Sequence, residues 1–476
     1  MNFVLTDTLR EIIINSTYIA SALLFLFGLK GLTHPRTAVR GNFLAGLGML
    51  AAIVITLLDR SVISYQMLIS GVVIGTVIGA ILSVRVAMTE MPQLVALLNG
   101  FGGAASVFVG VAALMEASAS GNPELLNAQM TVSTVLSALI GAVTFWGSLI
   151  AYFKLQGIVV PSEAVVSTKL KIANAALFAV SLLAAWMIVV APPAFGWFTL
   201  LIVATSVMGV TLVLPIGGAD MPVVISLLNS YSGLAACATG FVLNNSILVV
   251  AGSLVGASGL ILTRIMCVAM NRSLANVIFG GFGAVAETAD GPSEDEVYAG
   301  KITSAGPEEI AMLFEGARRV VIVPGYGMAV SQAQHAVRDL ANLLEARGAE
   351  VLYAIHPVAG RMPGHMNVLL AEADIPYEKL KEMDEINPMF SETDVALVIG
   401  ANDVTNPMAR EDPTSPIAGM PILDVDKAHA VVVIKRSLSP GFAGIPNPLF
   451  AMKNTMMFFS DGKEAISQLA AAVKEL

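Results

Sequence analysis

The sequence predicts an α-helical transmembrane bundle of about nine helices, followed by a water-soluble α/β domain with a doubly wound parallel sheet. The 476 residues are 56% hydrophobic and only 13% charged, with a mean hydropathy of +0.77, which lies outside the range of soluble globular domains. Residues 1–271 hold only 10 of the 26 basic and 8 of the 35 acidic residues. Beyond residue 290, short β-branched runs alternate with helical segments. We therefore expect a transmembrane domain at 1–271, a linker at 272–290 and a soluble domain at 291–476.

Each predicted span is a largely apolar segment close to the length of about 20 residues that a helix needs to cross a bilayer. The first span lacks the basic start and small-residue cleavage site of a signal peptide, so we expect it to be retained. In chain order the spans are Ile12–Gly28, Asn42–Leu58, Tyr65–Val84, Met91–Leu114, Thr131–Phe153, Ile172–Val190, Trp197–Leu214, Met221–Leu243 and Ser246–Met270.

Basic residues between the spans indicate the orientation, since loops on the cytoplasmic side are enriched in Lys and Arg. Placing the N-terminus outside leaves only Arg10 and Arg60 on the outer side. We expect the soluble domain in the cytoplasm, on the same side as Lys30, Arg36, Arg40, Arg85, Lys154, Lys169, Lys171, Arg264 and Arg272.

One segment of the membrane domain occurs twice. Residues 90–103 return as residues 220–233, with an acid, Met-Pro and then Leu-Leu-Asn at matched positions offset by 130. In each copy an acid beside a proline starts a helix, so a helix cap is one interpretation of Glu90 and Asp220. A functional role is the other interpretation, because Asp220 is the only charged residue between Lys171 and Arg264.

Two asparagines lie nine residues further into these repeated helices. At a rise of about 1.5 Å per residue, Asn99 and Asn229 sit roughly 13 Å deep, near the middle of the bilayer. Amides at that depth are costly unless they are paired or hydrated. Hydrogen bonding between helices and a hydrated path through the bundle are both compatible with this pattern.

Small residues and cysteines give weaker signals. Gly71, Gly75 and Gly79 have the four-residue spacing that permits close helix contact in lipid, as do Gly252 and Gly256, and we expect packing there. The two cysteines are thirty residues apart in apolar stretches, so no metal site is expected.

Alternating patterns predict the elements of the soluble domain. The strands are Arg319–Pro324, Glu350–His356, Asp394–Gly400 and Ala430–Lys435, and the helices are Met328–Arg347 and Gly364–Ala373. Residues 272–476 hold 27 acidic and 16 basic residues, and we expect this negative charge to repel both nucleic acid and anionic lipid, so no nucleic acid is expected as a partner.

The turn after the first of these strands, 325–330, is a variant of the dinucleotide-binding fingerprint with valine in place of the third glycine. Its first two glycines allow a tight turn and let the backbone approach a pyrophosphate. The next strand ends at His356 without an acid to bind a ribose 2′-hydroxyl, which disfavours NAD and permits NADP. Lys435, Arg436 and Ser437 end another strand as a candidate cradle for a 2′-phosphate, with a solvated strand exit as the alternative.

These motifs resemble those of the β subunit of proton-translocating nicotinamide nucleotide transhydrogenase, over nearly the whole chain. The resemblance rests on the paired Met-Pro and Leu-Leu-Asn segments, Gly-Tyr-Gly-Met-Ala-Val from Gly325, His-Pro-Val-Ala-Gly-Arg-Met-Pro-Gly-His-Met-Asn from His356, Gly-Ala-Asn-Asp from Gly400 and Lys-Arg-Ser from Lys435. It implies a Rossmann-like domain that binds NADP(H) in an orientation reversed from the usual one.

The resemblance also implies partners and a location. Hydride would pass directly between NADP(H) on this chain and NAD(H) on an α-type subunit, which carries further transmembrane helices, and the transfer would be coupled to inward proton translocation. We expect a dimer of such assemblies in the lipid bilayer of a bacterial inner membrane.

Matching motif positions implies a role for each site residue. Asp403 is the acid beside the nucleotide and the one expected catalytic residue. The cofactor-binding set is Gly325, Tyr326, Gly327, Met328, Ala329, Val330, His356, Val358, Ala359, Gly360, Arg361, Gly400, Asn402, Asp403, Lys435, Arg436, Ser437, Gly441 and Phe442. The proton path is Asn99, Asp220, Asn229 and Gly259.

Two positions depart from the family pattern. Some relatives have a membrane histidine at the position of Asn99, whereas none of the five histidines of this chain lies in a predicted span. The titrating group is then Asp220, a water chain or a histidine of the partner subunit. Phe442 stands where relatives have tyrosine, which removes a hydroxyl hydrogen bond.

Two other classes of function are alternatives to a transhydrogenase. A transporter or channel gated by a nucleotide-sensing domain is the alternative, but it would need a carbonyl filter or a charged ring, and the sequence contains neither pattern. A structural anchor that binds no nucleotide is the third class.

Overall fold

The computed structural model describes residues 7–32, 35–59, 65–161, 165, 167–193, 195–279, 297–298, 300–441 and 443–476. Within these ranges, nine helices are long and apolar enough to span a membrane, which confirms the predicted fold class for this part of the chain. They are α1 (Asp7–Leu32), α2 (Pro35–Asp59), α3 (Tyr65–Arg85), α4 (Met91–Ala119), α5 (Ala128–Gln156), α6 (Thr168–Val190), α7 (Phe195–Val213), α8 (Met221–Val242) and α9 (Ser246–Ala269).

Helices α4, α5, α8 and α9 form the core of the bundle, where small residues let the backbones approach. A Cβ added at Gly103 would lie 2.9 Å from the Thr144 side chain, so α4 and α5 meet there. A Cβ at Gly252 would lie 2.8 Å from Cα of Cys237, so α8 and α9 are equally close. These contacts confirm the packing predicted for the glycines of α9.

Helix α3 behaves differently. None of its residues is buried, and nothing lies within 4 Å of a Cβ built at Gly71, Gly75 or Gly79. The packing predicted from this glycine spacing is therefore wrong for the described part of this chain, because no other helix approaches that face.

The repeated segment forms the same structure twice. A 3-10 turn, η1 (Met88–Glu90) or η3 (Gly218–Asp220), runs directly into a helix, α4 or α8, that has proline in its first turn. Both acids stand at the N-cap position of their helix, as predicted, although neither makes a side-chain capping hydrogen bond.

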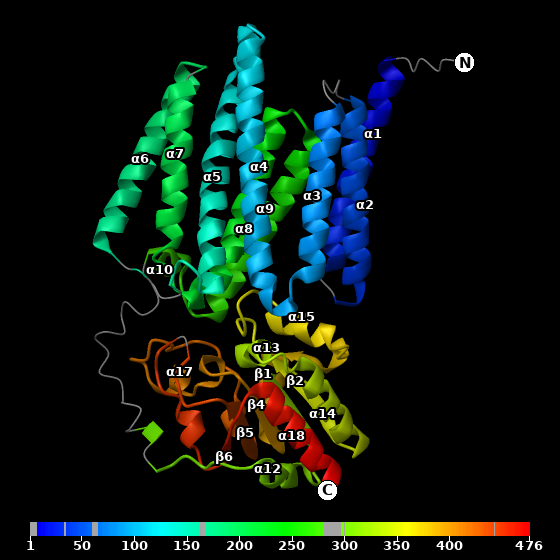
Figure 1. Ribbon diagram of the computed structural model, residues 1–476, viewed down its shortest axis with the longest axis vertical. Coiled ribbons are helices and arrows are strands. Elements are labelled where there is room, and N and C mark those ends of the chain that lie inside the picture. The colour runs from blue at the N-terminus through cyan, green and yellow to red at the C-terminus, as the bar shows by residue number, and fades with distance from the viewer. Residues whose placement is uncertain are drawn as a thin grey trace.

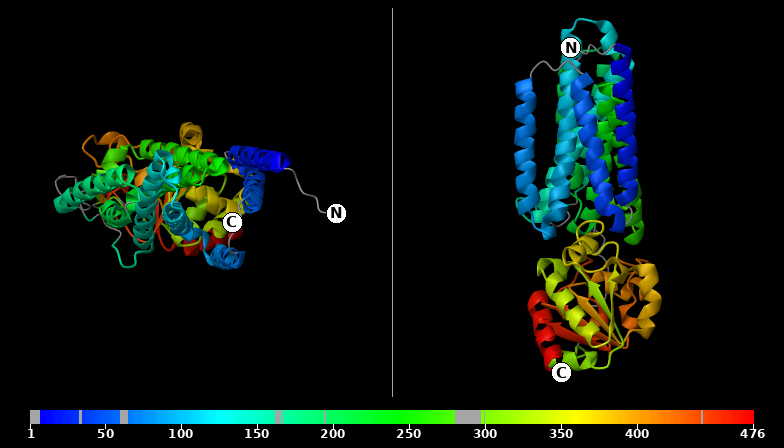
Figure 2. Two further views of the ribbon diagram at one scale, coloured as in Figure 1. Left: turned by 90° about the horizontal axis from the view of Figure 1, so that it is seen from above. Right: turned by 90° about the vertical axis from the view of Figure 1, so that its right-hand side faces the viewer.

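The soluble domain lies beneath the bundle, as Figures 1 and 2 show. Its six parallel strands have the order β3-β2-β1-β4-β5-β6, the doubly wound order of dinucleotide-binding domains. The strands are β1 (Arg319–Pro324), β2 (Glu350–Ile355), β3 (Leu380–Glu382), β4 (Val395–Ile399), β5 (Ala430–Lys435) and β6 (Thr455–Phe459). The helices are α12 (Pro307–Phe314), α13 (Tyr326–Val330), α14 (Gln334–Ala346), α15 (His365–Glu372), α16 (Met383–Ile386), α17 (Met408–Glu411) and α18 (Gly462–Glu475).

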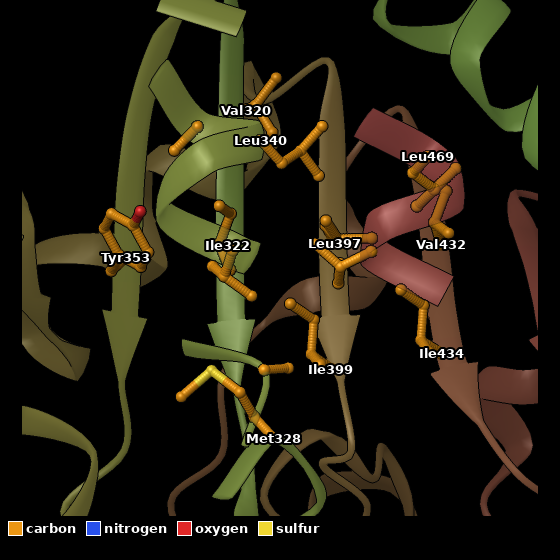
Figure 3. Close-up of a cluster of buried hydrophobic side chains, with 14 of the residues drawn as sticks. Val320, Ile322, Met328, Leu340, Tyr353, Leu397, Ile399, Val432, Ile434 and Leu469 are labelled. Carbon is orange, nitrogen blue, oxygen red and sulfur yellow. The ribbon is translucent and has the colours of Figure 1, made fainter. Parts of the chain in front are cut away.

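Both faces of this sheet are buried, as expected for parallel strands with β-branched runs. Val320 and Ile322 face a cluster that includes α14 and α18, and Figure 3 shows Leu340 and Leu469 of those helices against the strands. Val321 and Val323, which alternate with these residues along β1, face a second cluster on the opposite side of the sheet. The double covering leaves the ends of the strands as the place for a site.

Three local predictions differ from the structure. The single helix predicted at Met328–Arg347 is two helices, α13 and α14, because Gln332 between them has a φ of 50°. The sequence patterns did not predict β3, β6 or α18. The predicted linker 272–290 lies outside the described residues from residue 280 onward, while α10 (Leu274–Phe279) occupies its first part.

Candidate functional site

A cavity of about 470 Å³ opens at the carboxyl ends of the central strands. It lies where the chain leaves β1 and β4 toward opposite sides, which is the switch point at which doubly wound sheets bind ligands. Its lining includes fourteen of the predicted cofactor residues: Gly325, Tyr326, Gly327, Val330, Val358, Ala359, Gly360, Gly400, Asn402, Asp403, Lys435, Arg436, Ser437 and Gly441.

Three glycines build the floor of this cavity. The turn after β1 touches the turn after β4 backbone to backbone, with Gly325 N–H donating to Ile399 O and Gly327 N–H donating to Gly400 O, both at 2.9 Å. A Cβ on Gly327 would lie 2.6 Å from Cα of Gly400, which itself has a φ of 61°. Side chains at these positions would push the two turns apart, so glycine keeps the backbone accessible to a ligand.

Two cations and a hydroxyl lie along the edge of the cavity at the end of β5. Lys435 Nζ donates to Ser439 O at 2.7 Å, and it lies 4.9 Å from the centre of the Phe450 ring. Arg436 and Ser437 follow it and are exposed, and no carboxylate of the described residues pairs with Arg436. Such a group can take a phosphate with charge-assisted bonds.

Asp403 holds the loop after β5 in place. Its Oδ2 accepts a hydrogen bond from Ala443 N–H at 3.0 Å, and Gly441 packs so closely on the carboxylate that a side chain there would collide with it. Asp403 lines the cavity, so it is in position to contact a ligand. Phe442, between these loop residues, lies outside the described residues.

Four predicted cofactor residues do not line the cavity. Met328 and Ala329 are completely buried beneath the turn. His356 is also buried, with Nε2 donating to Pro421 O at 2.8 Å and Nδ1 accepting from Val358 N–H at 3.3 Å. Burial lowers the pKa of His356 to about 4, although the bond to Pro421 opposes the shift, so the ring is neutral and shapes the loop.

The fourth, Arg361, points out of the cavity toward the membrane domain. Its guanidinium lies 4.4 Å from the centre of the Tyr326 ring, and its Nη1 donates to the carbonyl of Leu155 near the end of α5 at 2.7 Å. Its backbone N–H donates to His365 Nδ1 at 3.1 Å. Burial, and then the nearby Arg361 charge, lower the pKa of His365 to about 4.

Other contacts also join the soluble domain to the bundle. Val358 lines the cavity and packs against a membrane cluster that contains Met221 and Val224. Asn271 Nδ2, after α9, donates to Ala418 O at 2.8 Å. The cavity wall is therefore in direct contact with the membrane helices.

The sequence patterns missed part of the cavity. Ser460, Asp461 and Gly462 line it after β6, and Asp461 caps α18 by accepting from Lys463 N–H at 3.1 Å. The available signal was the Ser-Asp-Gly turn itself, but the strand before it was not recognised. The other unpredicted lining residues are Ser331, Ala401, Val404, Ile434, Ser439 and Pro440.

In the membrane domain, Asp220 is completely buried just before α8, whereas its repeat partner Glu90 is exposed. Arg272 Nη2 lies 3.6 Å from Asp220 Oδ2, and no described residue forms a hydrogen bond to either carboxylate oxygen. Burial raises the pKa of Asp220 to about 6, although Arg272 opposes the rise. This carboxyl can therefore change its charge near neutral pH.

The two asparagines have different environments. Asn99 is buried and its Nδ2 donates to Ile225 O at 3.3 Å, so it links the two copies of the repeat. Asn229 is half-buried. A Cβ on Gly259 would lie 2.8 Å from Cα of Ser230, so the predicted glycine lets α9 approach α8 beside Asn229.

The sequence predicts Lys154 in the loop after the fifth span, but it lies in the last turn of α5 and only 1% of it is exposed. Its ammonium group donates to Leu214 O at 2.6 Å and to Ile216 O at 2.8 Å. These carbonyls follow α7 and precede the turn that carries Asp220. Lys154 therefore fixes the segment that positions the buried acid.

Comparison with known proteins agrees with this geometry. Residues 14–472 match the family described as NAD(P) transhydrogenase beta subunit. Two curated proteins named NAD(P) transhydrogenase subunit beta, from Rhodospirillum rubrum and from a defined strain of that species, are each 47% identical to this chain. Each alignment spans 463 residues, 96% of this chain and 98% of the relative. This multi-pass chain, with its Rossmann-like domain, therefore belongs to the family of NAD(P) transhydrogenase beta subunits, which are oxidoreductases.

Proposed function

We propose that this chain is the NADP(H)-binding membrane subunit of a proton-translocating transhydrogenase. One observation carries the proposal: Val358 lines the nucleotide cavity and packs against the membrane cluster that includes Met221, the residue after Asp220. A change in the cavity wall can therefore alter the surroundings of a titratable acid through direct packing.

The residues of the cavity fit NADP(H). The glycine floor leaves room for a pyrophosphate beside the first turn of α13, and Lys435, Arg436 and Ser437 supply two cations and a hydroxyl for a 2′-phosphate. Nucleotide bound there supplies the hydride donor or acceptor. Asp403 holds the loop that borders the ligand, and the buried strands beneath exclude water.

The second substrate, NAD(H), is assigned to an α-type partner subunit. Among the described residues we find one cavity with fingerprint glycines, whereas hydride transfer needs a donor and an acceptor together. We place this assembly, as a dimer, in a bacterial inner membrane with the soluble domain in the cytoplasm, where the proton enters or leaves beside Asp220. Arg272 limits the charge at that point, and Asn99, Asn229 and Gly259 lie along the proposed path.

The test uses this chain co-assembled with its partner in sealed vesicles. Hydride transfer from NADH to NADP⁺ and the pH inside the vesicles are recorded together, with and without an imposed pH gradient. We expect transfer and proton movement to start and stop together. Hydride transfer without proton movement would overturn the coupling, and proton flux without hydride transfer would favour a nucleotide-gated channel.

A further inference from the structure

The membrane bundle contains a second cavity, of about 580 Å³. Its lining residues come mainly from α5, α6, α7 and α8, and Ile278 of α10 also lines it. In Figure 1, α6 diverges from α5 toward the soluble domain, and α10 lies below α7, at the end of the bundle that faces this domain. Ten of the fourteen lining residues are apolar, so the cavity suits an apolar ligand.

The cavity extends through one leaflet. Lys171 lines it in the first turn of α6, close to the soluble domain, and Phe178 lines it about 10 Å deeper at a rise of about 1.5 Å per residue. Tyr231 of α8 lies about 15 Å from the start of that helix. Since half of a hydrocarbon core is about 15 Å thick, the cavity reaches from the headgroup region to the bilayer centre.

A helix from a partner subunit does not fit this space. A helix with side chains is about 10–12 Å across, so a single turn of about 5.4 Å occupies about 400–600 Å³, which is the whole cavity. A fatty acyl chain is narrower, wholly apolar and long enough for one leaflet. The dimensions therefore favour lipid over protein.

Charge at the mouth favours an anionic headgroup. Lys171 is exposed at headgroup depth, and basic pockets between transmembrane helices bind anionic lipids. Ser167, which also lines the cavity, precedes α6 without a side-chain capping bond, so the first N–H groups of the helix add favourable donors. Asn174 is already engaged with Thr211 and contributes little to selection.

We propose that this cavity binds one acyl chain of an anionic glycerophospholipid from the leaflet on the side of the soluble domain, with its phosphate at Lys171. The acyl chain of the lipid would contact Tyr231 and Leu234 of α8 and Ile278 of α10. The bound lipid would therefore fill the space between α6 and α8, the helix that follows Asp220. Any effect on proton coupling rests on the proposed function, whereas binding itself does not.

The binding test uses the complete enzyme in lipid nanodiscs that contain a phosphatidylglycerol with a photoactivatable group near the end of one acyl chain. After illumination, we expect the label on the peptide that contains Tyr231 and Leu234. Lys171→Gln should reduce this labelling about tenfold, because a charge-assisted contact is lost. Lys169→Gln is the matched control, since Lys169 is exposed on the same helix but does not line the cavity.

A second pair of variants tests the space itself. Ala175→Phe fills the cavity and should abolish labelling, whereas Ala176→Phe adds the same ring next to it without entering the lining. If Ala175→Phe does not fold, the comparison of Lys171→Gln with Lys169→Gln decides whether the cavity binds the lipid. Equal labelling by a phosphatidylcholine probe, or labelling spread evenly over the other transmembrane helices, would overturn the proposal. Because no hydride or proton is measured, failure here leaves the proposed function untouched.

Discussion

The guanidinium of Arg361 donates a hydrogen bond to the backbone carbonyl of Leu155, 206 residues away in the chain. The same guanidinium lies over the ring of Tyr326, which belongs to the nucleotide turn. One side chain therefore connects the cavity wall to the negative end of the α5 helix dipole. This contact positions the soluble domain against the bundle.

We predict that Arg361→Gln weakens this docking. The charged hydrogen bond contributes about 1.5–3 kcal/mol and the contact with the ring about 0.5–1 kcal/mol. Docking can be measured by cross-linking Asn271→Cys to Ala418→Cys, since these residues already contact each other, in a background with Cys237→Ser and Cys267→Ser.

The cross-link yield should fall in Arg361→Gln and stay unchanged in Arg338→Gln, whose arginine pairs with its neighbour Asp339 on α14. Proton movement per hydride should fall with it. If the cross-link yield is equal in the parent protein, Arg361→Gln and Arg338→Gln, the contact of Arg361 with Leu155 does not hold the soluble domain against the bundle.

We predict that Lys435→Ala with Arg436→Ala weakens NADP(H) binding much more than NAD(H) binding. The 2′-phosphate is the only group that distinguishes the two nucleotides, and each charge-assisted bond to it contributes about 1.5–3 kcal/mol. Titration calorimetry on this subunit purified without its partner measures both affinities at the nucleotide cavity. Lys453→Ala, an exposed lysine outside the cavity, is the control. An equal loss of affinity for both nucleotides would show that Lys435 and Arg436 do not bind the 2′-phosphate.

We predict that Asp220→Asn suppresses proton pumping and proton-driven NADPH formation together, by about 5- to 150-fold, the range of a coupling free energy of about 1–3 kcal/mol. The variant cannot change charge, whereas the native carboxyl, with its pKa raised to about 6, can. Glu90→Gln is a control built into the chain, because Glu90 has the same local structure but is exposed. Measurements in sealed vesicles that show equal pumping by both variants would place the proton route elsewhere.

We predict that acid destabilises the soluble domain partly through His356. Burial lowers the native pKa of His356 to about 4, so between that value and its ordinary value of 6.5 the unfolded chain binds a proton that the native state does not. Stability is therefore complete above about pH 6.5 and falls as the pH is lowered toward 4. His356→Gln should show a smaller loss of melting temperature between about pH 7.5 and pH 5.

His335→Gln, in which an exposed histidine of α14 is replaced, should behave like the parent protein in the same experiment. A parent protein and a His356→Gln variant with identical pH profiles would show that His356 does not contribute to the acid response.

Local patterns were sufficient for the spans and for the centre of the cavity. β1, β4 and β5 are continuous apolar runs that end in glycines or cations, so the sequence alone indicated where their ends would meet. β6 contains two methionines and only one β-branched residue, Thr455, so its sequence alone does not mark a strand. It forms a strand by pairing with β5. Lys154 and Arg361 could not be interpreted from sequence, because the carbonyls that receive them lie about 60 and 206 residues away.

Helix α3 has a consequence for how the enzyme is made. It is the most hydropathic of the described spans and buries none of its residues in this chain, so its insertion depends on lipid alone and requires no neighbour to be folded. It can therefore enter the bilayer early during synthesis, before the other helices have packed. Its glycine face, which no described helix of this chain covers, then remains open to lipid or to a helix of another subunit.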